Sequence, residues 1–244
     1  MIEVKNIHKS FGAVQALRGV SFRAENSQIT GLLGPNGAGK TTTLRILYTV
    51  LQPDQGEAAV DGLDIRRKAL EVRQRIGVLP DSHGLYPRLT SRENIRYYGQ
   101  LHGLNGAALD AKISSLAKLL EMDDILDRRT EGFSTGQRMK VAIARALIHN
   151  PQNVMLDEPT AGLDVISTRS MRTFISRLRD EGKCVVFSSH IMQEVSMLCD
   201  HIIVIAAGQV AASGTPDDLR RAAGTENLED AFVAAIGSEE GLQK

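Results

Sequence analysis

Apolar and polar residues alternate along the first thirty positions of the chain, which is the pattern of strands with one buried face. The apolar positions in this stretch are Ile2, Val4, Ile7, Phe11, Val14, Ala16, Leu17, Val20 and Phe22. Two glycines stand between these short runs, at places where the chain can reverse direction. The pattern therefore predicts short antiparallel strands with turns near Gly12 and Gly19.

From about residue 85 the apolar spacing becomes helical. Two capping boxes, in which a Ser or Thr is followed three residues later by Glu or Gln, predict helix starts after Thr90 and Ser134. Between them lies an apolar stripe with the spacing of one helix face: Leu109, Ile113, Leu116 and Leu120. We therefore predict a helical block over residues 85–149.

Strands and helices alternate in the rest of the chain. Apolar runs predict strands at 29–33, 57–60, 76–79, 153–156, 184–188 and 202–205. Helices are predicted at 41–50, 165–181 and 191–199, and a last helix is capped by Thr215. This alternation indicates an α/β fold with a parallel sheet.

We expect one domain over residues 1–244. Its α/β core comprises 1–84 and 150–220, the helical block is inserted at 85–149, and 221–244 form a C-terminal tail that is frayed after Gly237.

Composition narrows the class of protein. The 29 basic and 29 acidic residues balance, so no global field favours nucleic acid or an anionic membrane surface as partner. The start of the chain does not resemble a signal peptide, and no stretch approaches the ~18 apolar residues needed to span a bilayer. Cys184 and Cys199 stand apart from any Cys or His cluster, as is typical of reduced thiols in a cytosolic protein. A role in transport would therefore need a second chain that crosses the membrane.

The strand at 29–33 runs into a glycine-rich loop that fits the pattern GxxxxGK[ST] at every fixed position. Backbone N–H groups of such a loop, together with the N-terminus of the following helix, bind polyphosphate. Lys40 is expected to reach the β- and γ-phosphates, and the Thr41 hydroxyl to ligate Mg²⁺. The predicted nucleotide-binding residues here are Gly34, Pro35, Asn36, Gly37, Ala38, Gly39, Lys40, Thr41 and Thr42.

A second candidate site is the apolar strand that ends in Asp157 and Glu158. The end of a parallel strand delivers its side chains to the sheet edge where ligands bind. Asp157 is expected to hold Mg²⁺ through water, and Glu158, turned the other way by the alternation of strand side chains, to polarise an attacking water.

The order of motifs resembles the ATP-binding cassette (ABC) transporter ATPases over residues 1–220. The motifs are the phosphate loop, Phe133-Ser134-Thr135-Gly136-Gln137, Val154–Glu158, Ala161–Asp164 and Ser188-Ser189-His190. The resemblance implies a RecA-like core with an N-terminal antiparallel β subdomain and an inserted helical subdomain. It also implies a pair of cassettes with two ATP molecules between them, the phosphate loop of one facing the pentapeptide of the other.

The resemblance implies further residue roles. Ser134, Gly136 and Gln137 would contact the ATP of the paired cassette, although Phe133 and Thr135 depart from the commoner LSGGQ. His190 would hydrogen-bond the γ-phosphate and orient the water, so that His190, Glu158 and Lys40 form the catalytic set. Phe11 would stack on adenine; considered alone, it is more typical of a core aromatic residue.

Asp81 occupies a position where the family usually has Gln. The run from Asp81 to Thr90 resembles a NatA-type subgroup related to a sodium exporter, in which an acidic residue is often found there. Asp81 would then reach Mg²⁺ through a water; the alternative is a solvated turn residue after Pro80. Tyr86, Pro87 and Leu89 are candidates for contact with a permease, or else staple the next helix.

The expected function is that of an ATPase subunit, using ATP and Mg²⁺, that energises an ABC exporter. In the ATP-bound state its expected partner is a second cassette, which is either a copy of this chain or a different cassette paired with it. The other expected partner is a polytopic permease, and no nucleic acid is expected to bind. Its expected location is the cytoplasmic face of the cell membrane, as a peripheral protein. Sodium efflux is the first candidate; export of a drug, lipid or polysaccharide is the alternative. A soluble cassette for DNA repair or translation would carry long insertions or tandem cassettes, and a small-molecule kinase would leave the pentapeptide unexplained.

Overall fold

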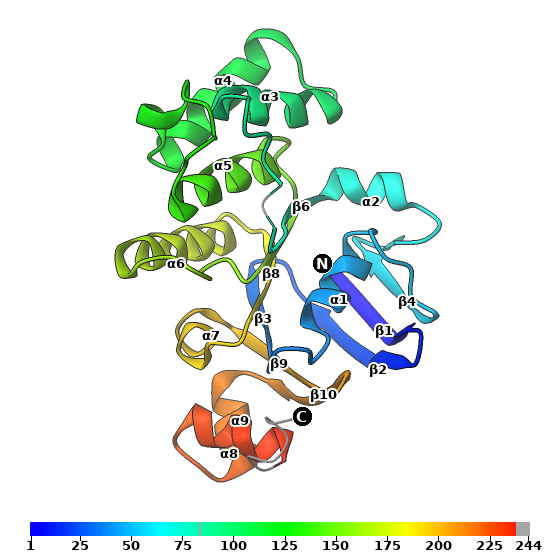
Figure 1. Cartoon of the computed structure of the whole chain (residues 1–244). Helices are drawn as coiled ribbons and strands as arrows, with labels where there is room; N and C mark the ends of the chain where they lie inside the picture. Colours follow the sequence, from blue (N-terminus) through cyan, green and yellow to red (C-terminus); the bar gives the residue numbers. More distant parts are fainter. Residues whose placement is uncertain (83, 238–244) are drawn as a thin grey trace.

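The computed structural model describes residues 1–82 and 84–237. Its central feature is a sheet with the strand order β10-β9-β3-β8-β7-β6 (Figure 1). All neighbouring strands in it are parallel except β10, which pairs antiparallel with β9. The bounds are β3 Gln28–Leu33, β6 Ile76–Leu79, β7 Asn153–Asp157, β8 Cys184–Ser189, β9 His201–Ala206 and β10 Gln209–Gly214. The predicted α/β fold with a mostly parallel sheet is confirmed.

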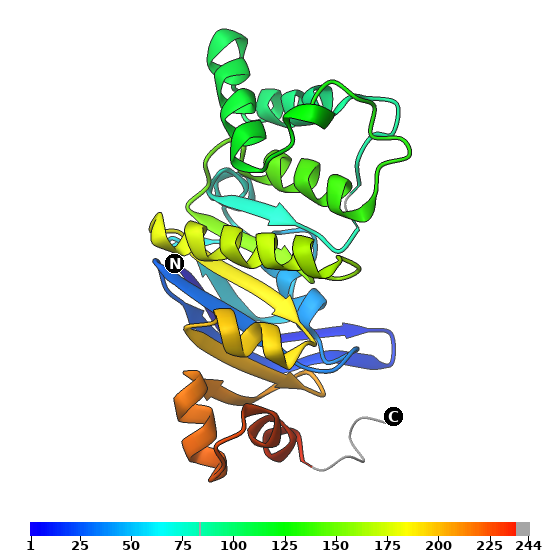
Figure 2. The same cartoon turned by 90° about the vertical axis from the view of Figure 1, so that its left-hand side faces the viewer.

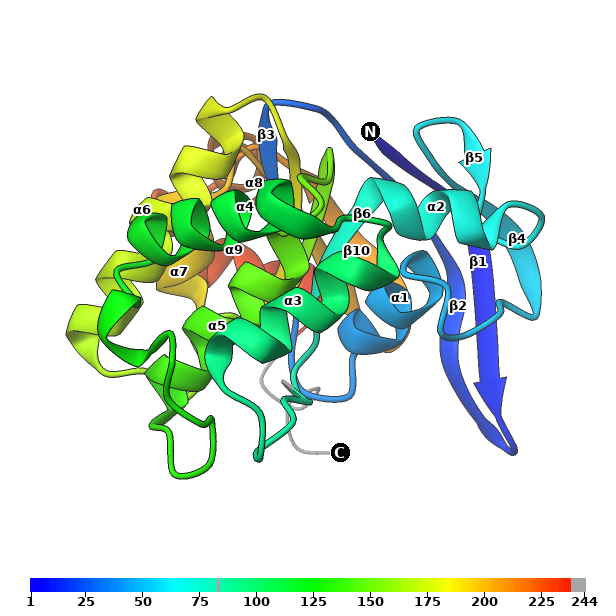
Figure 3. The ribbon, with the colours of Figure 1, turned by 90° about the horizontal axis from the view of Figure 1, so that it is seen from above.

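A second, antiparallel sheet has the order β2-β1-β4-β5. Its strands are β1 Ile2–Phe11, β2 Val14–Ala24, β4 Gln55–Val60 and β5 Leu63–Asp64. Seen from above, helix α1 (Lys40–Leu47) lies between this sheet and the central one (Figure 3). The N-terminal strands are therefore antiparallel, as their alternating pattern predicts.

The other helices are α2 Ala69–Arg75, α3 Ser91–Leu101, α4 Gly106–Leu119, the 3₁₀ turn Asp123–Ile125, α5 Thr135–Leu147, α6 Val165–Asp180, α7 Met192–Leu198, α8 Pro216–Ala223 and α9 Leu228–Ile236. Helices α6 and α7 cover one face of the central sheet, and α3 to α5 form a block beyond its β6 edge (Figure 2).

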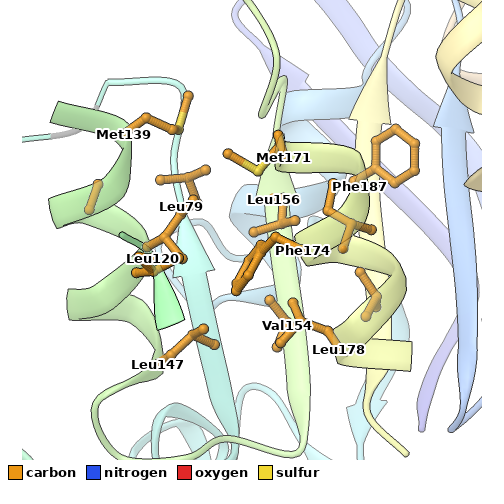
Figure 4. Packing of buried hydrophobic residues seen from close by; sticks show 14 of the residues in the cluster. Leu79, Leu120, Met139, Leu147, Val154, Leu156, Met171, Phe174, Leu178 and Phe187 are labelled. Carbon is orange, nitrogen blue, oxygen red and sulfur yellow. The ribbon is translucent and has the colours of Figure 1, made fainter. Parts of the chain in front are cut away.

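Alternate residues of the central strands enter two different cores, because successive strand side chains point to opposite faces. Val185 and Phe187 of β8 pack toward α6 and α7, whereas Val186 packs toward α1 and the antiparallel sheet. The first core includes the side chains of α5, β6, β7 and α6 that converge in Figure 4. Both faces of β8 are thus buried, which explains its continuous apolar run.

The helical block is fixed to the sheet by close contact between α5 and β6. A Cβ on Gly77 would lie 2.5 Å from the carbonyl oxygen of Ala146, so the absence of a side chain lets the helix approach the strand. Both predicted capping boxes are present, at Thr90 with Glu93 and at Ser134 with Gln137. The sequence therefore predicts where these two helices start.

Gly19 is not at a turn, and that prediction is wrong. Strand β2 runs through Gly19, which has φ +92° and marks a β-bulge: Ile7 pairs with Val20, and His8 with Arg18. The alternating pattern cannot distinguish a bulge from a turn, because a glycine interrupts it in both.

Two C-terminal elements are absent from the prediction. Strand β10 is polar and half-exposed, so it does not give an apolar run. Helix α8, which Thr215 caps, is followed by α9 and is therefore not the last helix. Helix α9 begins after Asn227, whose side chain accepts a hydrogen bond from the backbone of Glu229. The predicted fraying after Gly237 lies outside the described residues.

Candidate nucleotide-binding site

The candidate residues gather at one edge of the central sheet because its parallel strands end there. The glycine-rich loop follows β3, Asp81 follows β6, Asp157 ends β7, and His190 follows β8. Residues from four separate parts of the sequence are thereby brought to the place where α/β proteins bind ligands.

The loop owes its shape to its glycines. Gly37 and Gly39 have φ values of +79° and +110°, which side chains rarely allow. Gly34 contributes through close packing instead, since a Cβ there would lie 2.1 Å from the carbonyl oxygen of Ile205. Gly39 is the N-cap of α1, so the first amides of that helix point into the loop.

Lys40 lies under the loop, with its side chain 6% exposed. Its ammonium donates to the carbonyl oxygens of Gly34 at 2.7 Å and Pro35 at 3.1 Å, and lies 3.7 Å from a Glu158 oxygen. Burial lowers the pKa of Lys40, and the carboxylates of Glu158 and Asp157 oppose that shift. The cation is thus held by the loop at the wall of the cavity, where an anionic ligand would meet it.

Asp157 has one engaged oxygen and one that is free. Oδ1 accepts hydrogen bonds from Thr41 Oγ1 at 3.1 Å and from Ser188 Oγ at 2.6 Å. Oδ2 is buried and has no hydrogen-bond partner among the described residues. A buried carboxylate oxygen without a partner is costly, and a hard divalent cation is the ligand that would satisfy it. Thr41 and Asp157 therefore fit a Mg²⁺ ion.

Glu158 is directed toward His190 by its backbone. Strand β7 ends at Asp157, and Glu158 adopts φ +50°, so the strand alternation used in the sequence analysis is the wrong reason for its orientation. Its N–H donates to Ser188 Oγ at 3.0 Å, and its Oε2 lies 3.0 Å from His190 Nδ1. A non-glycine residue in the left-handed backbone conformation costs about 1–3 kcal/mol of folding free energy. Such a conformation persists where the surrounding structure holds it, typically at functional sites.

These residues enclose a cavity of about 280 Å³. It is lined by Ala16, the loop residues 36–42, Asp81, Glu158 and His190. Asp81, although exposed, thus faces the same cavity as the phosphate loop and the Glu158–His190 pair. Both interpretations of Asp81, as a residue that reaches Mg²⁺ through a water and as a solvated turn residue, stay predictions.

Phe11 lies at the end of β1, 47% exposed, and this excludes the core role that its sequence context suggests. Lys9 Nζ lies 5.6 Å from the centre of its ring. Ala16 of β2, not Phe11, lines the cavity itself. The stacking role of Phe11 stays a prediction.

The pentapeptide is not brought to this cavity. Ser134, Gly136 and Gln137 line a different groove of about 580 Å³, together with Leu163 and residues along most of α6. Ser134 caps α5 by accepting from the backbone N–H of Gln137 at 3.2 Å, and Phe133 is buried in the core. At Phe133, where the pentapeptide departs from LSGGQ, the side chain therefore packs in the hydrophobic core.

Ser188 is the site residue that sequence reasoning missed. Its hydroxyl joins Asp157 to the backbone of Glu158, and it stands opposite Asp157 in the β7–β8 register. The signal was the serine at the end of a buried strand, but only the pairing of β7 with β8 identifies its partner.

The chain is similar to known proteins of one family. A family model described as ABC transporter matches residues 17–161, more than half of the chain. The chain is 47% identical over 91% of its length, and 91% of the relative, to the ABC transporter ATP-binding protein NatA of Bacillus subtilis. It is 32% identical over 98% of its length, and 79% of the relative, to the linearmycin resistance ATP-binding protein LnrL of that species.

Among solved structures, a dimeric ATP-binding cassette in a post-hydrolysis state, bound to ADP and phosphate, superposes with a TM-score of 0.81. It is 26% identical, and the alignment covers 88% of this chain and 98% of that one. In the described part of this chain, no helix has the length and apolar character required to cross a membrane. The chain belongs to the ABC transporter family, as an ATP-binding subunit with ATPase activity.

Proposed function

We propose that ATP is hydrolysed at the cavity between the glycine-rich loop and the Glu158–His190 pair. Residues 34–42 hold the phosphates, with Lys40 directed at the β- and γ-phosphates. Glu158 accepts a proton from the attacking water, and His190 hydrogen-bonds the γ-phosphate and orients that water. The observation that carries this proposal is the buried, unpartnered Oδ2 of Asp157 beside Thr41. Mg²⁺ held there would neutralise charge on the β- and γ-phosphate oxygens.

The site is completed by a second cassette, either a copy of this chain or a paired one. The separation of Ser134 and Gly136 from the phosphate loop supports this, because their helix N-terminus can then meet the phosphate bound by the partner. Val165 and Ile166, at the start of α6 beside Asp164, are 86% and 80% exposed. A partner that covers them would bury two large apolar side chains.

The chain energises a separately encoded permease and lies at the cytoplasmic face of the membrane. Tyr86 is 46% exposed and packs edge-on against Tyr97, which is also exposed. The buried side chain of Asn94 fixes the loop at Tyr86 through two hydrogen bonds. Its Oδ1 accepts from the backbone N–H of Tyr86, and its Nδ2 donates to the carbonyl oxygen of Tyr86. These polar contacts hold the backbone of the loop, and the exposed part of the Tyr86 ring is the proposed permease contact.

Sodium is the first candidate substrate, through the resemblance to the NatA-type subgroup and the 47% identity to NatA. The alternative is export of a drug, lipid or polysaccharide. The relative named for linearmycin resistance supports a drug as the substrate within this alternative. A soluble cassette without a transport role is favoured less, because the matched relatives are named for transport and resistance.

We expect inverted membrane vesicles that contain this chain with the permease of the neighbouring reading frame to accumulate radioactive sodium when ATP is added. Vesicles with the Lys40→Ala variant should not, because the ATP site is then disabled. Absence of sodium uptake together with ATP-dependent uptake of an amphipathic drug would select the alternative substrate class. A neighbouring frame without membrane spans would instead favour a soluble cassette.

We expect Asp81→Asn to retain ATP binding and to change the Mg²⁺ dependence of hydrolysis. Loss of an anionic oxygen that lines the cavity should raise the half-saturating Mg²⁺ concentration by about tenfold, the lower end of the range for an outer-shell ligand. The measurement is ATP hydrolysis against Mg²⁺ at fixed ATP. Asp124→Asn, an exposed change in the helical block, is the matched control. Superimposable curves for wild type and Asp81→Asn would place Asp81 outside the metal site.

A further inference from the structure

Glu194 is a buried acid that the proposed chemistry does not use. It lies on α7 with 2% of its surface exposed. Its Oε2 accepts hydrogen bonds from Thr160 Oγ1 at 2.5 Å and from Ser189 Oγ at 3.2 Å. Burying a carboxylate is costly unless it is well hydrogen-bonded, so a site that holds one specifies its partners closely.

The two hydroxyls belong to the two segments that carry the proposed catalytic groups. Thr160 stands two residues after Glu158, and Ser189 immediately precedes His190. The Ser189 hydroxyl also accepts from the N–H of Ile191 at 3.0 Å, so the backbone on both sides of His190 is tied to one oxygen. Both hydroxyls meet at the same oxygen of Glu194, which joins the segment after β7 to the end of β8.

We propose that Glu194 is a positioning residue for ATP hydrolysis, which holds Glu158 and His190 at their 3.0 Å separation. The proposal rests on the roles given above to these two residues. Ser188 makes a second link between these parts of the chain, because its hydroxyl bonds both Asp157 at the end of β7 and the backbone of Glu158. Arg172 of α6, whose Nη2 lies 3.9 Å from Glu194 Oε1, supplies a nearby positive charge.

We expect Glu194→Ala to lower kcat by about 10- to 100-fold, because small displacements of catalytic groups have effects of this size. The KM for ATP and the Kd of a non-hydrolysable ATP analogue should change by less than about threefold, since the phosphate loop is untouched. Steady-state hydrolysis and equilibrium binding measure these values.

Glu194→Gln is the informative companion, since an amide oxygen can accept from both hydroxyls. We expect it to recover kcat to within about fivefold of wild type. Asn153→Ala is the control for loss of a buried polar group: Asn153 is buried at the opposite end of β7 and bonds Asp61. It should lower the Tm comparably and leave kcat within about twofold.

A wild-type kcat in Glu194→Ala would overturn the proposal, and so would equal impairment of Glu194→Gln, which would assign the effect to charge. If Glu194→Ala does not fold, Thr160→Val and Thr160→Ser replace it: only Ser keeps the hydroxyl, so only Val should lower kcat. Full activity of His190→Ala would instead refute the proposed roles at the site. The two failures are thus distinguishable.

Discussion

Lys40→Ala should abolish measurable ATP hydrolysis, with a fall of at least about 10²- to 10³-fold, and should weaken ATP binding severely. The physical reason is the place of the ammonium: it is buried, bonded to two loop carbonyls and 3.7 Å from Glu158. A cation fixed in this position stabilises the charge on the β- and γ-phosphates without reorganising. Removal would also take away a positive charge that interacts with the carboxylates of Asp157 and Glu158, which adds repulsion of the anionic ligand.

Lys183→Ala is the matched control for this change. Lys183 is also buried, and its ammonium also donates to a backbone carbonyl, that of Pro151, but it lies at the start of β8, the opposite end of the strand from His190. We expect a loss of stability with hydrolysis close to wild type. Turnover and nucleotide binding, measured for both variants, test whether the loss of activity is specific to Lys40. Near-normal turnover in Lys40→Ala would refute the assignment of the loop.

Glu158→Gln should keep nucleotide affinity within about threefold and lower hydrolysis by about 10²- to 10⁴-fold, the range of a general base. The amide preserves the shape and the backbone bond to Ser188, but it cannot accept a proton from water. Because ATP then binds without being consumed, the paired cassettes should accumulate. Size-exclusion chromatography with and without ATP detects this as an earlier elution.

The matched control is Asp61→Asn, which removes a carboxylate from another left-handed residue, φ +49°, far from the site at the end of β4. It should hydrolyse ATP normally and show no ATP-dependent accumulation of the pair. A Glu158→Gln protein that stays monomeric and fully active would contradict both the catalytic role and the pairing of cassettes.

The order and type of the main elements could be predicted because they depend on local chemistry. The capping boxes at Thr90 and Ser134 start their helices within the chain segment that defines them. The β6 strand at residues 76–79 was predicted at its observed bounds, since an apolar run is closed by Pro80. Prediction failed where polarity hides an element, as in β10, and where one residue type serves two structures, as at Gly19.

The phosphate loop could be recognised from the sequence alone, because its function depends on a backbone conformation that Gly37 and Gly39 permit locally. The sequence also placed Asp157, Glu158 and His190 directly at or after apolar strands. Which of these groups come into contact depends on the three-dimensional fold. The β7–β8 pairing brings Ser188 to Asp157, the left-handed turn at Glu158 directs its carboxylate to His190, and α7 carries Glu194 beneath both segments. Such contacts join residues about thirty positions apart, and their geometry depends on strand order and helix packing, which no local pattern encodes.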